Sequence, residues 1–399
     1  MKRNQLLKES EWWVEEAIIT EAQREKLLEH YPEKQNKPVL LTFAALFIGL
    51  GFLTFTASNW SYLADWGRMA VLLLSMSAFY VAGERVYKKK SARVGSSLIL
   101  TALLIFGAAI FLVGQMYHYT AFSASPFLLW SMAAAGLYVV MREGLFYYAA
   151  AVIITVGQVY SGLVFQDFYV WLGLLLLGGL GWVVYETRSL PFAGVFAVSY
   201  YIQALVLVFS GGYPYYWLII GSLALYIADD LITQKGQTRI WKTSAVVFMF
   251  AVFFLQIFFL GDGYAETLTE SSLYFFLIWA VLFVLAVVRS ALSTTNYYWI
   301  DLLLFIPVFR FPSGDLFSLI VLFIYAVLWL VSGYQQEVRR WVNKGTAAFL
   351  LTTLAAYFQL AWDFMDRSVF FFVGGLLLFV LSYGLEKKRR SFRREGEEQ

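Results

Sequence analysis

The residues of this chain best suited to binding chemistry are amides placed inside apolar sequence. The apolar run 106–119 ends in Gln115, Tyr117 and His118, and His118 is the one histidine within such a run. An amide surrounded by hydrocarbon needs a hydrogen-bond partner, so it normally faces another helix, water or a ligand. The pattern therefore predicts a polar region lined by several segments. Amides at a comparable place in other apolar runs are Asn59, Gln158, Gln203, Gln256 and Gln359.

Membrane-spanning helices must position these amides. The 399-residue chain is 60% hydrophobic and 14% charged, with a mean hydropathy of +0.66, outside the usual range of soluble domains. Apolar stretches of about 20 residues, enough to cross roughly 30 Å of hydrocarbon, recur without the alternation of barrel strands. The sequence predicts an all-α, polytopic helical membrane protein with about fourteen transmembrane helices. The predicted spans are 38–57, 68–86, 94–114, 124–141, 145–165, 168–186, 190–210, 213–229, 240–260, 272–289, 296–311, 315–334, 344–361 and 367–385.

The placement of basic residues predicts an orientation. With the N-terminus inside, 27 of the 30 basic residues fall on the cytosolic side, and only Arg68, Arg310 and Arg367 fall outside. Lysine and arginine are enriched in cytoplasmic loops. We therefore expect the protein in the cytoplasmic (inner) membrane, multi-pass, with both termini cytosolic.

Three parts of the chain differ in composition. Residues 1–37, with seven basic and eight acidic side chains, predict a cytosolic helical segment, and residues 387–399 form a basic cytosolic tail. Residues 38–386 make up the transmembrane helical domain between them. Within the first part, Thr20-Glu-Ala-Gln23 matches a capping box, so a helix is expected from about Glu21 to Tyr31. This segment either packs as two helices, or lies on lipid headgroups or holds a cytosolic protein partner.

The amides lie on one side of the predicted membrane, in the outer halves of the odd-numbered spans. Gly114-Gln115-Met-Tyr117 recurs as Gly157-Gln158-Val-Tyr160 one hairpin later, a pattern compatible with diverged helical-hairpin repeats. Arg68 adds an outward guanidinium that could bind an anion. The plainer interpretation is that the amides hold helices together and that Arg68 pairs with the neighbouring Asp65.

Several kinds of chemistry lack the residues they need. The chain has no cysteine, glycine-rich phosphate loop, HExxH sequence or nucleophile elbow. We therefore expect no metal, no cofactor and no catalytic residues, and an enzyme is the less favoured class. The basic runs Lys88–Lys90 and Lys387–Arg390 adjoin spans, so topology and anionic lipid explain them and no nucleic-acid binding is expected. The expected partners are membrane lipids and a small-molecule or lipid-linked ligand.

Parts of the first 145 residues or so resemble bacterial predicted membrane proteins with an N-terminal domain of unknown function 2157. The matching pieces are Trp13 with Ile18-Ile-Thr-Glu-Ala-Gln23, Ala57-Ser-Asn-Trp60, Arg68, Gly114-Gln-Met-Tyr-His118 and Leu129-Trp130. The family usually has a glycine where this chain has Ala17. The resemblance implies that Asn59, Trp60, Arg68, Gln115, Tyr117 and His118 act as a linked set, and it implies no activity.

The leading functional hypothesis is that the protein binds or translocates a polar or amphiphilic molecule, such as a lipid-linked envelope intermediate, through an outward-facing polar cavity. One alternative is an outer-face membrane enzyme acting on a lipid-linked substrate, with Arg68 holding the anion and His118 moving a proton. Another is a membrane scaffold or sensor that uses residues 1–37. The predicted substrate-binding residues are Asn59, Trp60, Arg68, Gln115, Tyr117, His118, Gln158 and Gln203.

Overall fold

The computed structural model is helical throughout the parts of the chain that it describes. These are residues 18–29, 39–57, 64–117, 122–232, 239–260, 273–292, 299–311 and 313–361, with isolated residues near both ends. The predicted all-α class is confirmed. The chain folds as two compact units, Met1–Tyr119 and Thr120–Gln399. The division predicted at residues 37 and 386 stays a prediction.

Eight helices among the described residues are long and apolar enough to cross a membrane. The protein is therefore a multi-pass membrane protein, while the predicted count of fourteen spans is not confirmed. The predicted last span, 367–385, lies almost wholly outside the described residues. The eight helices are Trp66–Lys89, Ala92–Gly114, Gly144–Phe165, Val170–Thr187, Leu190–Ser210, Ile240–Phe259, Leu273–Ala291 and Gly314–Gln335.

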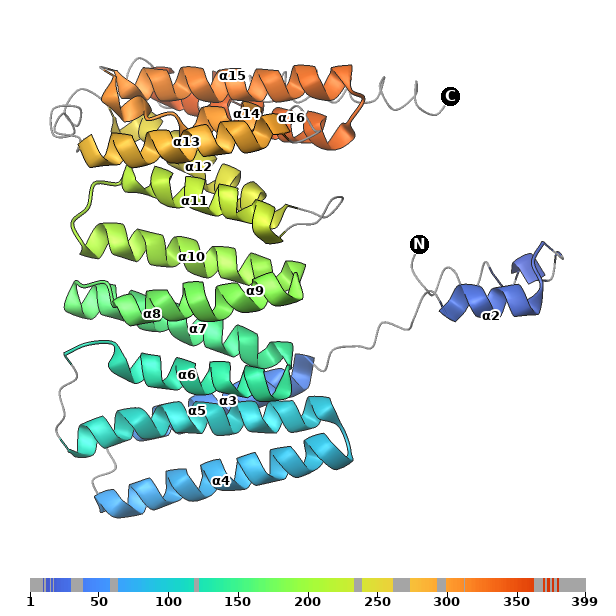
Figure 1. Cartoon of the computed structure of the whole chain (residues 1–399), viewed down its shortest axis with the longest axis vertical. Helices are drawn as coiled ribbons and strands as arrows, with labels where there is room; N and C mark the ends of the chain where they lie inside the picture. Colours follow the sequence, from blue (N-terminus) through green and yellow to red (C-terminus); the bar gives the residue numbers. More distant parts are fainter. Residues whose placement is uncertain are drawn as a thin grey trace. The chain divides into compact units, whose positions relative to one another are not determined.

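The first unit is built on α5 (Ala92–Met116), which packs against both α3 (Val39–Ala57) and α4 (Asp65–Lys89) (Figure 1). Leu72 and Ile105 lie in its small buried core. A Cβ on Gly95 would lie 2.4 Å from the Tyr87 backbone nitrogen, so glycine permits the close approach of α4 and α5. Because α4 and α5 form an antiparallel hairpin, the start of α4 and the end of α5 lie at the same end of this pair.

The predicted capping box near the N-terminus is confirmed. The Thr20 backbone N–H donates to Gln23 Oε1 at 2.9 Å, and the Gln23 backbone N–H donates to Thr20 Oγ1 at 3.3 Å. Both bonds satisfy amides that the first helical turn leaves without partners. Helix α2 (Glu21–Glu29) follows, within the limits that the sequence predicted.

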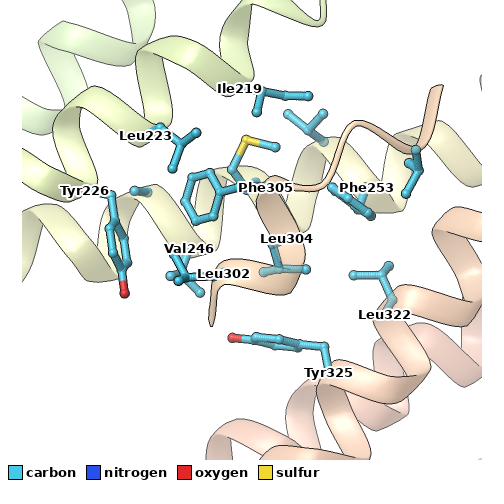
Figure 2. Packing of buried hydrophobic residues seen from close by; sticks show 14 of the residues in the cluster. Ile219, Leu223, Tyr226, Val246, Phe253, Leu302, Leu304, Phe305, Leu322 and Tyr325 are labelled. Atoms are coloured by element: carbon cyan, nitrogen blue, oxygen red, sulfur yellow. The ribbon is translucent and has the colours of Figure 1, made fainter. Parts of the chain in front are cut away.

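In the second unit, most helices pack on a helix that is near them in the chain, although α13 packs on α11 and α15 packs on α12 (Figure 1). Helix α7 packs on α6 and α10, α12 packs on α11 and α15, and α16 packs on α15. A buried core of aromatic and aliphatic side chains runs from α11 through α12 to α15 (Figure 2). The bounds are α6 (Ser125–Met141), α7 (Gly144–Tyr160), α10 (Leu190–Ser210), α11 (Trp217–Ile232), α12 (Ile240–Phe259), α13 (Leu273–Leu292), α15 (Gly314–Gln335) and α16 (Arg339–Ala361).

The predicted sixth span is helical but not a uniform α-helix. It consists of α8 (Val170–Leu174), a π-helical segment Leu175–Leu180 and α9 (Gly181–Thr187). Glycines 178 and 179 lie in the widened part, where the absence of side chains allows the backbone to shift its hydrogen bonds. A second π-helical segment, Ser161–Phe165, extends α7.

The prediction of a continuous helix over 296–311 is wrong. Helix α14 covers only Trp299–Leu302, and the 3₁₀ turns Leu303–Phe305 and Val308–Arg310 follow on either side of an extended Ile306. Pro307 explains the break, because proline has no N–H to donate and clashes with a preceding helical turn. Non-helical backbone at membrane depth is tolerated where protein covers it, and Leu304 and Phe305 are fully buried.

Candidate functional site

Six of the predicted binding residues belong to the first unit. Asn59, Trp60 and His118 lie outside the described residues, as does the side chain of Gln115, although its backbone is part of α5. Tyr117 follows α5 directly and is exposed.

Arg68 is the remaining member of this group. It lies in the first turn of α4 and is half-buried. The α4–α5 hairpin brings Arg68 and the backbone of Gln115 to the same end of the first unit. Whether these residues meet Gln158 and Gln203, in the second unit, stays a prediction.

Gln158 lies near the end of α7, is fully buried, and supports a loop. With the amide turned so that its nitrogen faces the Tyr169 carbonyl, Gln158 donates to that oxygen at 3.1 Å and accepts from the Tyr169 backbone N–H at 3.0 Å. Tyr169 is the N-cap residue of α8, where no side chain of its own caps the helix. Gln158 therefore supplies, from another helix, an acceptor for an amide at the start of α8.

Gln203 lies at a comparable depth on α10 and differs from Gln158 in its hydrogen bonding. Its side chain is 5% exposed, and Nε2 has no hydrogen-bond partner in the described part of the chain. A buried amide donor without a partner costs about 1–3 kcal/mol, and such groups are rare in folded proteins. Among the described amides of the predicted row in the second unit, Gln203 is therefore the one with a buried amide nitrogen that no hydrogen bond satisfies.

Gln203 lines a groove of about 400 Å³, which we call the Gln203 groove. Its walls come from α8, the π-helical segment Leu175–Leu180, α10 and the start of α11. Most of the wall is hydrocarbon, and none of its lining side chains is charged. Side chains in the wall include Leu174, Leu177, Tyr200, Ala204, Leu207 and Trp217.

Two further contacts shape the Gln203 groove. A Cβ on Gly173 would lie 3.0 Å from the Phe168 ring and 3.5 Å from Gln203 Oε1, so glycine leaves room beside the amide. Phe168 borders the groove and directly precedes Tyr169, the residue that Gln158 holds. Gln158 therefore positions one edge of the groove in which Gln203 lies.

Tyr200 closes the opposite wall. Its hydroxyl donates to the Gly221 carbonyl at 2.8 Å and so joins α10 to α11. Sequence reasoning missed Tyr200, Gly173 and Trp217, all of which line the groove. Gly173 could have been noticed as a glycine inside an apolar run, where small residues permit close helix approach, but no sequence pattern marks the π-helical wall.

Two later amides of the row are satisfied within the protein. Gln256 donates to the Tyr215 hydroxyl at 3.2 Å and accepts from the Ser318 hydroxyl at 3.2 Å. Gln359 Nε2 lies 3.5 Å from Asp315 Oδ2. Both join helices, as the plainer interpretation of the row expects. Within the described residues, no three His, Asp or Glu side chains are placed to hold a metal ion.

Residues 11–147 match the model of the family Predicted membrane protein (DUF2157), which confirms the resemblance seen in the sequence. The matched range includes Arg68, Gln115 and His118 and ends before Gln158. No curated protein and no solved structure matches the chain. The Gln203 groove therefore lies in the part of the chain for which the comparisons offer no relative.

Proposed function

We propose that this membrane protein binds an amphiphilic molecule, taken up from the bilayer, in the Gln203 groove, and that this binding is the first step of its translocation. The observation that carries the proposal is the buried Nε2 of Gln203, which has no partner among the described residues and lies in an apolar groove. Pockets for small molecules typically combine apolar walls with a few placed polar groups.

The energetics of binding favour a ligand that has a polar part and an apolar part. An acceptor atom opposite Gln203 Nε2 would regain much of the roughly 1–3 kcal/mol that the unpartnered donor costs. In a bilayer, lipid chains already shelter apolar surface, so the apolar part of the ligand contributes shape fit rather than a large hydrophobic gain. The polar contact therefore decides which molecule binds.

The acceptor should be uncharged. No charged side chain lines the groove, and a phosphate at this depth would keep its full desolvation cost. Long-chain alcohols and esters fit, as does the chain end of a lipid-linked envelope intermediate whose charged group stays in the headgroup region. We propose this class as the cargo.

The orientation of the chain decides which leaflet supplies the ligand. With 27 of 30 basic residues on the cytosolic side, both termini face the cytosol of a bacterial cell and Gln203 lies in the outer half of the inner membrane. In that orientation the groove would receive its ligand from the outer leaflet.

Photolabelling with matched probes tests the proposal. We would reconstitute the protein in vesicles with a diazirine-bearing hexadecanol or with the corresponding hexadecane, which lacks the oxygen. We expect the wild type to be labelled along Val170–Leu180 and α10 about tenfold more by the alcohol, the ratio that about 1.4 kcal/mol gives.

The variant Gln203→Leu should reduce that ratio to about one, whereas Gln359→Leu, which changes an amide already bonded to Asp315, should keep it. Equal labelling of wild type by the two probes, or an alcohol preference that survives Gln203→Leu, would rule the groove out as a site for polar-ended chains.

A scaffold role is the second candidate, since Trp12 and Ile18 are exposed next to the capped helix α2. If the N-terminal segment holds a cytosolic protein, Trp12→Ala with Ile18→Ala should release that protein from purified membranes and leave the alcohol preference unchanged. Loss of the alcohol preference instead would argue that the segment serves the groove.

A further inference from the structure

Among its described residues, the second unit contains two partly buried lysine–aspartate ion pairs, and they differ in how they are held. Lys242 Nζ lies 2.8 Å from Asp230 Oδ1, and Lys344 Nζ lies 2.6 Å from Asp301 Oδ1. Buried ion pairs are not dependable stabilisers, because removal of two charges from water costs about as much as their attraction returns. Charged side chains inside spans often mark ion pathways instead.

The first pair is enclosed. The Lys242 side chain is 5% exposed, and both residues lie on continuous helices, α12 and α11. Asp230 also accepts from Arg239 at 2.9 Å. Loss of one cation would therefore leave Asp230 with another.

The second pair has the opposite arrangement. The Asp301 side chain is 6% exposed, whereas that of Lys344 is 35% exposed. The lysine also lies 3.9 Å over the Trp329 ring, a cation–π contact that does not need the carboxylate. Lys344 thus has both a route outward and a second favourable contact, whereas the Asp301 side chain is enclosed.

Asp301 lies on the broken segment, which we define as residues 299–310: helix α14, the two 3₁₀ turns and the extended backbone between them. Its four-residue helix α14 gives way to 3₁₀ and extended backbone within the next five residues. Interrupted helices inside membrane proteins supply oxygen ligands for Na⁺ and H⁺ near their broken ends. Asp301 Oδ1 further accepts from the Tyr325 hydroxyl at 3.3 Å and from Trp329 Nε1 at 3.1 Å, so a tyrosine oxygen lies beside the carboxylate.

The surrounding charged and titratable groups come from four helices. Tyr325 on α15 and Lys344 on α16 face Asp301 directly. Tyr226 on α11 lies on the other side of the broken segment, against the Phe305 ring (Figure 2), and Lys242 on α12 lies 4.9 Å over the Tyr226 ring. Without Lys344, Asp301 would be a buried carboxylate that keeps, within the described part of the chain, the hydroxyl of Tyr325 and the indole N–H of Trp329 as its hydrogen-bond partners.

We propose that Asp301 is an exchange site for a small monovalent cation, Na⁺, at which the incoming cation displaces Lys344. A cation must take the lysine's place, because an uncompensated buried carboxylate is strongly unfavourable. The Asp301 carboxylate and the Tyr325 hydroxyl supply hard oxygen ligands, which suit Na⁺ when Lys344 withdraws toward solvent. This exchange site is separate from the Gln203 groove, whose lining includes none of Asp301, Tyr325 and Lys344.

The test is ²²Na⁺ binding to the purified full-length protein at pH 8, with choline as the replacement cation. Lys344→Gln removes the competing ammonium, so we expect it to bind Na⁺ at least tenfold more tightly than wild type. Asp301→Asn should abolish binding. The control variant Lys242→Gln should leave Na⁺ affinity unchanged, since Asp230 keeps Arg239.

Two results would overturn the proposal. One is the absence of Na⁺ binding in both the wild type and Lys344→Gln. The other is a Lys344→Gln protein that folds but binds Na⁺ no more tightly than wild type.

Discussion

Gln158 and Gln203 are the same residue type, lie on neighbouring helices and belong to the same predicted row, yet the structure uses them differently. Gln158 exchanges two hydrogen bonds with the backbone of Tyr169. Gln203 is nearly as buried, but its Nε2 has no partner among the described residues. The difference supports our proposal that one amide stabilises the fold while the other binds a ligand.

Because of this contrast, we expect a leucine substitution to lower the stability of the protein at Gln158 and to raise it at Gln203. Leucine at a satisfied amide removes bonds and strands their partners, whereas leucine at an unpartnered amide removes only a penalty. Stability measurements on a set of glutamine-to-leucine variants therefore distinguish structural amides from ligand-binding ones.

Gln158→Leu should have the largest effect. It leaves the Tyr169 N–H without an acceptor at the start of α8 and removes the support of one groove edge. We expect a loss of about 3 kcal/mol, from two lost bonds and one stranded donor. Thermal or denaturant unfolding in detergent would measure it, and a loss below about 1 kcal/mol would mean that Gln158 is not structural.

Gln256→Leu should destabilise the protein less, by about 1–2 kcal/mol. The Tyr215 hydroxyl loses its donor, but Ser318 retains its bond to the Gly314 carbonyl at 2.7 Å. The same unfolding assay applies. A loss of stability as large as that of Gln158→Leu would show that the bond between Gln256 and Ser318 is important, even though Ser318 keeps its bond to the Gly314 carbonyl.

Gln203→Leu should change stability in the opposite direction. Without added ligand, replacing a buried unpartnered amide by a side chain of similar size should stabilise the protein by about 1 kcal/mol. The variant should also lose the stabilisation that added hexadecanol gives to wild type. Destabilisation comparable to that of Gln158→Leu would mean that Gln203 has a structural partner, and the contrast would fail.

Gln359→Leu should have the smallest effect, within about 0.5 kcal/mol of wild type, because its bond to Asp315 is long at 3.5 Å and only partly buried. This variant therefore serves as the baseline. A large effect here would indicate that polar contacts in this unit are generally stronger than their lengths imply.

The helical class, the limits of most helices and one helix start could be predicted well from the sequence. Apolar stretches separated by charged turns gave most helices close to their limits, and Thr20 with Gln23 gave a helix start because a capping box depends only on neighbouring residues. Pro307 can be read from the sequence. The apolar residues on either side of it are as compatible with a membrane-spanning helix as with the 3₁₀ turns that they form.

The candidate site was predictable only in part. The row of amides included Gln203, because a polar residue inside an apolar run is unusual by itself. The partner of each amide was not predictable, since Tyr169 is eleven residues from Gln158 and reaches it through a loop. The groove wall depends on π-helical geometry at Leu175–Leu180, for which composition gives no signal.

The most direct test of the contrast is a high-resolution structure of the protein in lipid nanodiscs. We predict elongated density in the Gln203 groove, with a polar atom about 2.7–3.2 Å from Gln203 Nε2, while Gln158 keeps its two bonds to Tyr169. A Gln203 amide bonded to another residue of the protein, in a groove closed by its own side chains, would contradict the assignment of this amide to a ligand.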